Sequence, residues 1–268
     1  MSKKKVLIVT EELSPYTLET TISQIVGKLP QAVHEAGMEV RVLMPRYGLI
    51  NERRHRLHEV VRLSGMNIII DDDDYPLIIK VASLPGVRLQ VYFLDNEEFF
   101  KRKAMFHDDN GKPFEDNEDR MIFFCKGVIE TIRKFGWPAD YIHCFGWMTA
   151  LIPFYLKTAY KNDPILNRFK IIYTPNEEDI TSYFTDRFAI KASINNLEPE
   201  DLKPFIKSKK VALVEGAVSY ADGIIIGSEI VQDSVKNAIK KLKNVPVKDF
   251  VSPEHIKEEY IPFYEQLG

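Results

Sequence analysis

The chain has 268 residues, 45% of them hydrophobic and 28% charged, and its formal net charge is −3. This composition is typical of a globular protein with a substantial core, and the positive charge is too dispersed to mark a nucleic-acid surface. Apolar runs fall short of the roughly 18 residues of a membrane span, the N-terminus lacks a signal-peptide pattern, and two cysteines make neither a disulfide framework nor a metal cluster, so we expect a cytoplasmic protein without metal or cofactor.

The first 45 residues predict a strand, a helix and a second strand. Residues 6–10 are a continuous apolar run, which is typical of a buried parallel strand. Apolar residues spaced by three and four between positions 22 and 33 predict a helix. We expect Pro30 to kink or break this helix and Gly37 to end it. Residues 40–44 predict the next strand, which gives a right-handed βαβ unit.

The middle of the chain predicts closely spaced strands over residues 68–70, 77–81 and 89–94. Asp71 to Asp74 join the first two strands. Four carboxylates in a row suggest a cation site, but calcium loops take their ligands from alternating positions around a turn. We therefore interpret this run as the solvated tip of a β-hairpin inserted into the α/β pattern.

Alternation of helices and strands then resumes. The pattern predicts a helix over 117–135 that ends at Gly136, and further strands and helices along the rest of the chain. These are strands at 140–143, 170–174 and 223–227, a helix at 147–160, and a mostly helical segment at 179–221. Together they predict an α/β fold, Rossmann-like and doubly wound, with a mostly parallel sheet covered by helices on both faces.

Ligands of such sheets bind beyond the carboxyl ends of the strands. The segments that leave the predicted strands there are rich in polar and aromatic residues. No glycine-rich phosphate loop follows the first strand, and glycine is sparse, at 13 of 268 residues. A dinucleotide oxidoreductase and a P-loop kinase are therefore unsupported. The segments in question are 10–15, 45–48, 143–147, 174–176 and 228–229.

These segments resemble the N-terminal starch-synthase catalytic domain of bacterial starch and glycogen synthases. The most specific matches are Pro45-Arg-Tyr-Gly48 and Asp116-Asn-Glu-Asp-Arg120, each in order and at the spacing of the family. The resemblance implies one half of a GT-B fold and the transfer of glucose from ADP-glucose to the end of an α-1,4-glucan. The other matching segments are 5–12, 26–30, 140–143, 147–153, 155–158 and 220–222.

The chain departs from the family at the donor motifs. The family element K-T-G-G-L is replaced by Leu18 to Ile22, which removes a lysine and two glycines. Phosphate affinity should fall on charge grounds, and close backbone approach is hindered. In the family element H-x-H-D-W, the second histidine and the aspartate have become Phe145 and Gly146. We expect residues 1–268 to form a single synthase-like N-terminal domain, with about residues 244–268 as a tail packing back on it and the second GT-B domain absent.

The resemblance implies a set of site residues, each with a structural alternative. His143 is a candidate for sugar binding or proton transfer, or a structural histidine satisfied by its neighbours. The resemblance implies that Asp116 lies near the acceptor or donor sugar. The structural alternative is that Asp116 and Arg120 cap a helix and form an i, i+4 ion pair. The candidate catalytic residues are His143 and Asp116. The candidate substrate-binding residues are Glu12, Arg46, Tyr47, Arg120, Trp147 and Asn176.

Three of these candidates carry a more specific structural alternative. An arginine at a strand exit, such as Arg46, often ties loops together through its several donors, and we favour that role for Arg46 and Tyr47. Trp147 is either a stacking platform for a glucose ring or the start of a packed helix.

Two functions stay open at this point. The first is a synthase-like glucosyltransferase, weak or inactive as a single domain, or completed by a partner chain. The second is a non-catalytic binding or regulatory module that uses the sheet edge to bind a glucan, a sugar phosphate or a protein. The expected small-molecule partners of this chain are an α-glucan or a sugar nucleotide. A structural role in a homo-oligomer is a third possibility, because a lost domain interface would leave an apolar patch exposed. No nucleic-acid or membrane partner is expected.

Overall fold

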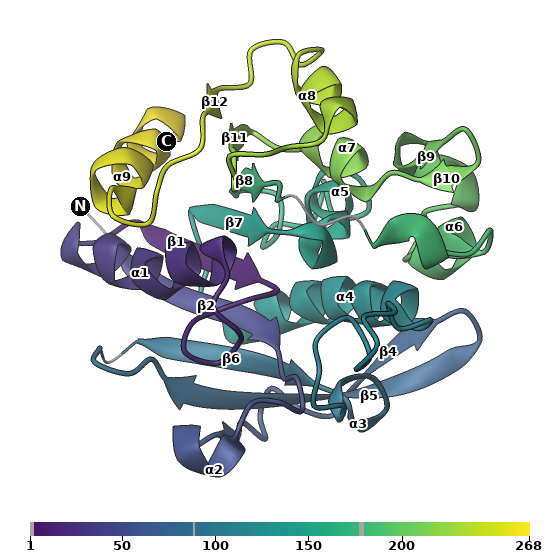
Figure 1. Cartoon of the computed structure of the whole chain (residues 1–268), viewed down its shortest axis with the longest axis horizontal. Helices are drawn as coiled ribbons and strands as arrows, with labels where there is room; N and C mark the ends of the chain where they lie inside the picture. The colour runs from purple at the N-terminus through teal and green to yellow at the C-terminus, as the bar shows by residue number, and fades with distance from the viewer. Residues whose placement is uncertain (1–2, 88, 177–179) are drawn as a thin grey trace.

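The computed structural model describes residues 3–87, 89–176 and 180–268. Its main sheet has ten strands in the order β12-β11-β8-β7-β1-β2-β6-β5-β3, and β4 pairs with β5 beside this path (Figure 1). The strands span Lys5–Thr10 (β1), Glu39–Pro45 (β2), His58–Glu59 (β3), Met66–Ile70 (β4), Asp73–Ser83 (β5), Gln90–Asp95 (β6), Tyr141–Phe145 (β7), Lys170–Thr174 (β8), Gly223–Ile225 (β11) and Val247–Lys248 (β12).

The α-helices lie between these strands and at the C-terminal end. They span Thr21–Glu35 (α1), Glu52–His55 (α2), Glu97–Phe100 (α3), Asn117–Phe135 (α4), Leu151–Lys157 (α5), Phe188–Ala192 (α6), Leu213–Val218 (α7), Asp233–Ile239 (α8) and Ile256–Leu267 (α9). Short 3-10 helices occupy Trp147–Thr149 (η1), Thr181–Tyr183 (η2) and Pro199–Phe205 (η3).

The parallel half of the sheet is the core of the molecule. In β1, residues 6–10 are all buried, as expected for a strand with a parallel neighbour on each side. Ile8 pairs with Val42 of β2 on one side and with His143 of β7 on the other. This register brings the carboxyl ends of β1, β2 and β7 to one edge of the sheet.

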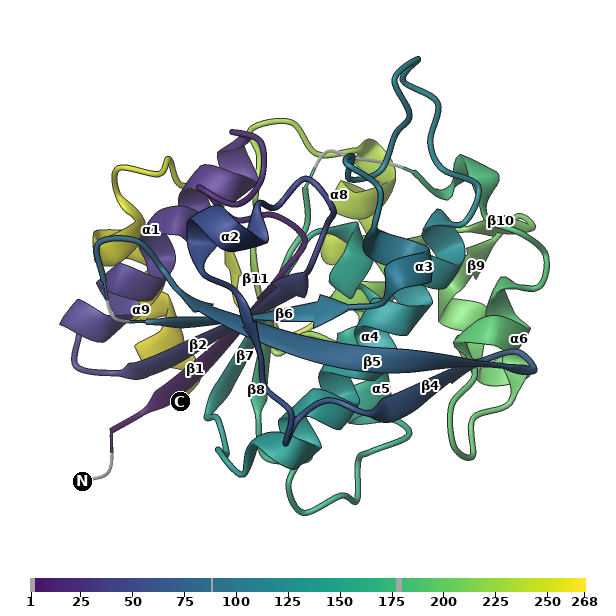
Figure 2. The same cartoon turned by 90° about the horizontal axis from the view of Figure 1, so that it is seen from below.

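The strands β4 and β5 form an antiparallel hairpin at the far end of the sheet. Its tip is shorter than the sequence suggests, because Asp71 and Asp72 form the turn while Asp73 and Asp74 already belong to β5. The tip is also not simply solvated, since Asp71 forms an ion pair with Arg187 next to α6. The hairpin extends along α4 toward α6 (Figure 2).

The two longest helices follow from their sequences. Thr20 and Ser23 form a reciprocal capping box at the start of α1. Pro30 does not break α1, which continues to Glu35, so that part of the prediction is wrong. The helix α4 ends at Phe135 as predicted, and Gly136 takes the left-handed conformation, with φ 58°, that glycine tolerates.

The segment between β8 and β11 is less helical than the pattern predicts. It holds η2, α6, η3 and α7, and also a two-stranded hairpin of Ile206–Lys207 (β9) and Lys210–Val211 (β10). Residue 179, where this prediction begins, lies outside the described residues. The apolar runs in this segment are short and separated by polar residues, so the helices that form here are short as well.

The C-terminal helix α9 lies beside α1, although the two are more than 200 residues apart in the chain (Figure 1). Its inward side chains are buried, and they include three aromatic rings. In the described part of the chain, no helix is long and apolar enough to cross a membrane. The buried residues of α9 are Ile256, Tyr260, Ile261, Phe263 and Tyr264.

Candidate functional site

The direction in which the chain moves across the sheet reverses between β1 and β7. From β1 the chain moves to β2 and β6, and after α4 it returns to the other side of β1 and continues through β7, β8 and β11. Such a switch point, at the carboxyl ends of the strands, is where open α/β sheets bind ligands. The candidate site is built around these strand ends.

Glu11 is a fully buried carboxylate directly after β1, and it ties three strand ends together. One oxygen accepts a hydrogen bond from the backbone N–H of Met148 at 2.9 Å, and the other accepts from the side-chain amide of Asn176 at 2.8 Å. Because Met148 follows β7 and Asn176 follows β8, this side chain fixes three adjacent loops. Glu11 is not among the residues predicted from the sequence, although its place directly after a buried apolar strand is a signal that could have identified it.

Gly146 provides the space that the Glu11 carboxylate occupies. Its φ is +80°, a conformation that favours glycine, and a Cβ built on it would lie 2.1 Å from the Glu11 carboxyl carbon. The Gly146 carbonyl accepts hydrogen bonds from the hydroxyls of Thr149, at 2.9 Å, and Tyr173, at 3.0 Å. The loop after β7 is therefore fixed by the Glu11 carboxylate, which packs against Gly146, and by the hydrogen bonds to the Gly146 carbonyl.

Glu12 is also buried and connects β1 to the start of α1. It accepts a hydrogen bond from the hydroxyl of Thr20, the residue that caps α1. Burial raises the pKa of Glu12, and the Thr20 hydrogen bond opposes this rise. The side chain thereby fixes the loop between β1 and α1 at the sheet edge.

His143 is completely buried in β7, and each of its ring nitrogens lies near a hydroxyl. Nδ1 is 2.7 Å from Oη of Tyr264 on α9, and Nε2 is 2.7 Å from Oγ1 of Thr174 at the end of β8. The imidazole stacks on Phe145, with ring centroids 4.0 Å apart. Burial lowers the pKa of His143 well below its ordinary value, so the ring is neutral at physiological pH.

Trp147 and Asn176 each carry a polar atom that lacks a partner among the described residues. The Trp147 indole is 1% exposed, is packed edge-on against Phe106, and has an unpaired Nε1–H. Asn176 is partly buried, and its Oδ1 accepts no hydrogen bond within the described chain. One atom is a donor and the other an acceptor, and a hydroxyl group can satisfy both kinds.

Asp116 takes the N-cap position of α4 but makes no capping hydrogen bond with its side chain. It pairs with Arg102, and its Oδ1 is buried without a partner in the described structure. The i, i+4 ion pair between Asp116 and Arg120 that the sequence allows does not form. The reason is that Arg102, from the loop after α3, takes the carboxylate.

Arg120 lies fully buried behind Asp116. Its Nε donates to the carbonyl of Phe99 at 2.9 Å, and one terminal nitrogen donates to Oδ1 of Asn117 at 2.6 Å. The other terminal nitrogen is unpaired among the described residues. Burial lowers the pKa of Arg120 to about 10, and the side chain stays charged at neutral pH.

Arg46 and Tyr47 both contact residues from other parts of the chain. Arg46 Nε lies 2.9 Å from Asp95, a carboxylate that Lys80 also contacts at 2.9 Å. Tyr47 is buried against Phe100 and Phe106, and its hydroxyl donates to Met148 Sδ at 3.2 Å.

Seven of the eight candidate residues form two neighbouring groups and one outlier, and the eighth, Glu12, contacts Thr20 at the start of α1. Contacts of Glu11 join the loops that carry Trp147 and Asn176, with His143 buried beneath them in β7. Asp116, Arg120 and Tyr47 form the second group, which Tyr47 links to the first through Met148. Arg46 belongs to a separate ion-pair network. Within the described residues, no group of three or more His, Cys, Asp or Glu side chains is arranged to hold a metal ion.

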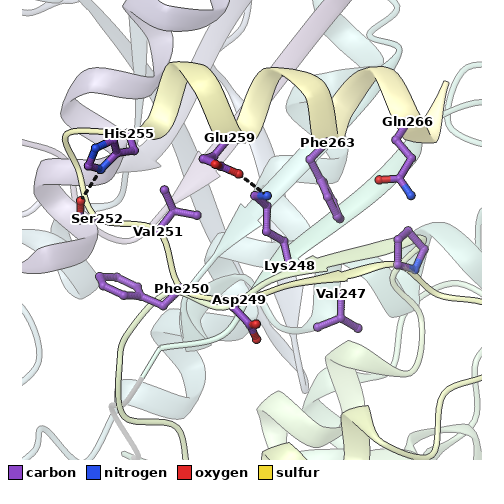
Figure 3. Close-up of a pocket in the computed structure, with 11 residues that line it drawn as sticks. Val247, Lys248, Asp249, Phe250, Val251, Ser252, His255, Glu259, Phe263 and Gln266 are labelled. Atoms are coloured by element: carbon purple, nitrogen blue, oxygen red, sulfur yellow. Dashed lines mark hydrogen bonds and ion pairs between the residues drawn. The ribbon is translucent and has the colours of Figure 1, made fainter.

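A separate cavity lies at the end of the sheet, between β12 and α9 (Figure 3). It is lined by residues 246–252 and by side chains of α9, and by none of the candidate residues above. Lys248 of β12 points to Glu259 of α9 across it and forms an ion pair.

Comparisons with known proteins agree with the fold and with the resemblance. The family model of the starch synthase catalytic domain matches residues 5–243. A glycogen synthase of Pelodictyon phaeoclathratiforme is 34% identical over 234 residues, which are 86% of this chain and 47% of that protein. A glycogen synthase of Chlorobium limicola is 41% identical over 171 residues, which are 63% of this chain and 35% of that protein.

A solved structure shares the fold. The catalytic domain of starch synthase IV from Arabidopsis thaliana, bound to ADP and acarbose, superposes with a TM-score of 0.70 at 17% identity, covering 95% of this chain and 53% of that chain. The present chain therefore spans about half the length, or less, of the curated relatives named above.

Proposed function

This chain belongs to the starch synthase catalytic domain family, and from that premise we propose that its sheet edge binds glucose units as one part of a glucosyltransferase site. The reaction proposed for the complete site transfers glucose from ADP-glucose to the end of an α-1,4-glucan. We further propose that this single domain transfers glucose weakly or not at all. The observation that carries the proposal is the set of loops that Glu11 holds together at the switch point.

The geometry supports sugar binding because polar atoms without partners meet the needs of hydroxyl groups. The Trp147 Nε1–H and the Asn176 Oδ1 suit an acceptor and a donor, respectively. Oδ1 of Asp116 is a further buried acceptor. We propose Asp116, rather than His143, as the group that contacts substrate, since both ring nitrogens of His143 are already engaged. His143 is proposed as a positioning residue that acts through Thr174.

Glucosyl transfer requires more of the site than sugar binding does, because charge must be stabilised as well. The bond from the sugar C1 to the diphosphate breaks, a bond to the acceptor hydroxyl forms, and the leaving diphosphate needs positive charge nearby. In the loop between β1 and α1, Leu18 is 70% exposed and Glu19 is also exposed. An apolar side chain and a carboxylate offer a diphosphate no stabilisation, which supports weak transfer.

A second candidate function is a non-catalytic module that binds a glucan or a sugar. The engagement of both His143 nitrogens favours it, because a histidine in this state has no free nitrogen for proton transfer. The two candidates share the sugar-binding edge and differ in turnover.

The test measures ADP release from ADP-glucose with glycogen present, together with the binding of maltoheptaose by calorimetry. We expect saturable maltoheptaose binding that weakens about tenfold in Trp147→Phe and Asp116→Asn, and little ADP release. The control is Asp233→Asn, which removes a carboxylate whose side chain is 93% exposed and pairs with Lys236 rather than with any of the candidate residues. Glycogen-dependent ADP release that Asp116→Asn abolishes identifies a working transferase. Absence of both binding and release refutes both candidates.

A further inference from the structure

The strand β12 ends the main sheet and leaves one edge open. The carbonyls of Pro246 and Lys248 accept hydrogen bonds from Ile224 and Ile226, at 3.0 and 2.9 Å, so these groups face β11. Backbone groups alternate in direction along a strand, and the N–H and C=O of Val247 therefore point outward. No strand in the described chain pairs with this side.

A helix runs alongside this open edge. The cavity between β12 and α9 is bounded by residues 246–252 on the strand side and by His255, Glu259, Phe263 and Gln266 on the helix side; we call it the β12 groove (Figure 3). Lys248 points to α9, whereas Val247 points to the opposite side of the strand and is 44% exposed. A strand edge flanked by a helix is the arrangement in which PDZ and PTB domains bind an extended peptide as an added strand.

The β12 groove itself is not basic, because its lining holds Asp249 as well as Lys248, which is paired with Glu259. The segment that leads into β12 is, by contrast, strongly basic. Residues 236–248 contain five lysines and no acidic residue. Lys240, Lys241 and Lys243 are exposed, and none of them forms an ion pair with another described residue. Lys236 makes only a loose contact, 3.7 Å from Asp233. The lysines are spread through the segment, so they do not stand out as a run in the sequence.

From these three features we propose that the β12 groove docks an extended, acidic peptide segment of a partner protein, which adds as a strand to Val247. The open backbone groups select a polypeptide over a nucleic acid or a membrane, because only a polypeptide offers matching N–H and C=O groups in register. The lysines select acidic side chains. They also disfavour a second copy of this chain, since pairing β12 with itself would bring two lysine-rich segments together.

The test uses a fluorescein-labelled ten-residue peptide of alternating valine and glutamate with blocked ends, measured by fluorescence anisotropy on the intact chain. Two variants separate the two contributions. Val247→Pro removes the outward N–H and keeps every lysine. A triple variant, Lys240→Glu, Lys241→Glu and Lys243→Glu, reverses the charge and keeps the strand edge. Its matched control reverses three other exposed lysines, around η3 and β10: Lys203, Lys209 and Lys210.

We expect Val247→Pro and the triple variant of Lys240, Lys241 and Lys243 each to weaken binding at least tenfold, and the control triple to stay within twofold of the parent. A peptide N-methylated at alternate residues should also bind at least tenfold more weakly, which tests the added strand without changing the protein. Hydrogen exchange should slow over residues 246–252 when the parent peptide binds.

Three results overturn the proposal. The first is peptide binding that neither Val247→Pro nor N-methylation weakens, which makes the surface a general polyanion site. The second is equally tight binding of a single-stranded DNA decamer or of anionic phosphatidylserine vesicles. The third is a concentration-dependent dimer in sedimentation that Val247→Pro abolishes, which assigns the groove to a second copy. Because no readout involves glucose transfer, the outcome is independent of the proposed function.

Discussion

Glu11 and Gly146 depend on each other at the switch point of the sheet. The carboxylate occupies the volume that any side chain at position 146 would need, and in return it fixes the loop in which Gly146 lies. A buried carboxylate is tolerated only when its oxygens are hydrogen-bonded, and here Met148 and Asn176 supply donors. The pair thus determines how the loops after β1, β7 and β8 are spaced.

We predict that Gly146→Ala destabilises the protein by about 3 kcal/mol. The backbone of Gly146, with φ 80° and ψ 177°, lies in a region populated almost only by glycine, which costs another residue about 1–3 kcal/mol. The overlap with Glu11 adds about 1–3 kcal/mol. The measurement is the free energy of unfolding in urea. Gly37→Ala is the comparison for a positive φ without overlap, because Gly37 has a φ of +83° and nothing within 4 Å of the added Cβ. Equal losses in the two variants would show that the overlap with Glu11 is relieved at no cost.

His143 provides a second test at this scale. We predict that His143→Phe costs about 3 kcal/mol, because it leaves the hydroxyls of Tyr264 and Thr174 buried without a partner. Adding Tyr264→Phe and Thr174→Val should recover part of this loss, since removing both sides of a buried hydrogen bond costs less than removing one. Thermal and urea unfolding of the single and triple variants measure this. A triple variant less stable than the single one would contradict a structural role for the histidine.

The sequence predicts some of these residues better than others. A loop-tying role for Arg46 is predicted from its residue type at a strand exit, and in the structure this side chain forms an ion pair with Asp95. The pairing of Asp116 with Arg102 could not be predicted, because the two residues are brought together by a loop whose path depends on packing. The same holds for Glu11, because its partners Met148 and Asn176 lie in loops that are 137 and 165 residues away in the sequence.

At the scale of elements, α4 is held to its neighbours by a buried lysine. The Lys126 amine donates to the carbonyl of Ile69 in β4, at 2.9 Å, and to that of Lys191 in α6, at 2.8 Å. No ion pair of Lys126 with a described carboxylate is formed, and burial lowers the pKa of this side chain to about 8. One side chain thus connects the helix, the hairpin and the segment after β8.

This lysine predicts a pH dependence of stability. The pKa of Lys126 is about 8 in the folded protein and its ordinary value of 10.5 in the unfolded chain, so the unfolded state binds more protons between these values. Stability contributed at this site should therefore rise as the pH increases from about 8 to about 10.5, by up to about 3 kcal/mol. The measurement is urea unfolding from pH 7.5 to 10, compared with Lys126→Met. The difference between the two proteins should change with pH, and a constant difference would contradict the prediction.

Periodicity determines how well each element could be predicted. Helix α4 is long and strongly patterned, and its end is marked by Gly136, so both of its boundaries could be predicted. The helices between β8 and β11 are short, and their positions are set by packing against α4 and α5 rather than by their own pattern. Pro30 shows that packing can also override a local signal. Proline disfavours a helix interior, but α1 continues past Pro30 because its inner face is buried.

At the scale of the whole molecule, α9 packs beside α1 and covers the part of the sheet that would otherwise be exposed there. Tyr264 stacks on Tyr141 of β7, with ring centroids 5.6 Å apart, and also contacts His143. Phe263 lies against Gly223 at the start of β11, where an added Cβ would come within 2.9 Å of its ring. The last helix in the sequence therefore covers strands from both the middle and the end of the chain.

We predict that deleting residues 256–268 unfolds the domain or converts it to a loosely packed state. The deletion removes five buried apolar side chains, each worth about 1.5–3 kcal/mol of burial, so the total of about 10 kcal/mol is comparable to the stability of a whole domain. The measurements are near-UV circular dichroism and the binding of the dye ANS. A control that stops after Glu265 keeps all five of those side chains and should stay folded. Adding the peptide 250–268 in trans should restore the near-UV signal, because the helix then repacks on α1, Tyr141 and His143. If the deleted protein keeps its melting temperature and does not bind ANS, α9 is not part of the core, and it would then be better explained as a helix that docks a partner.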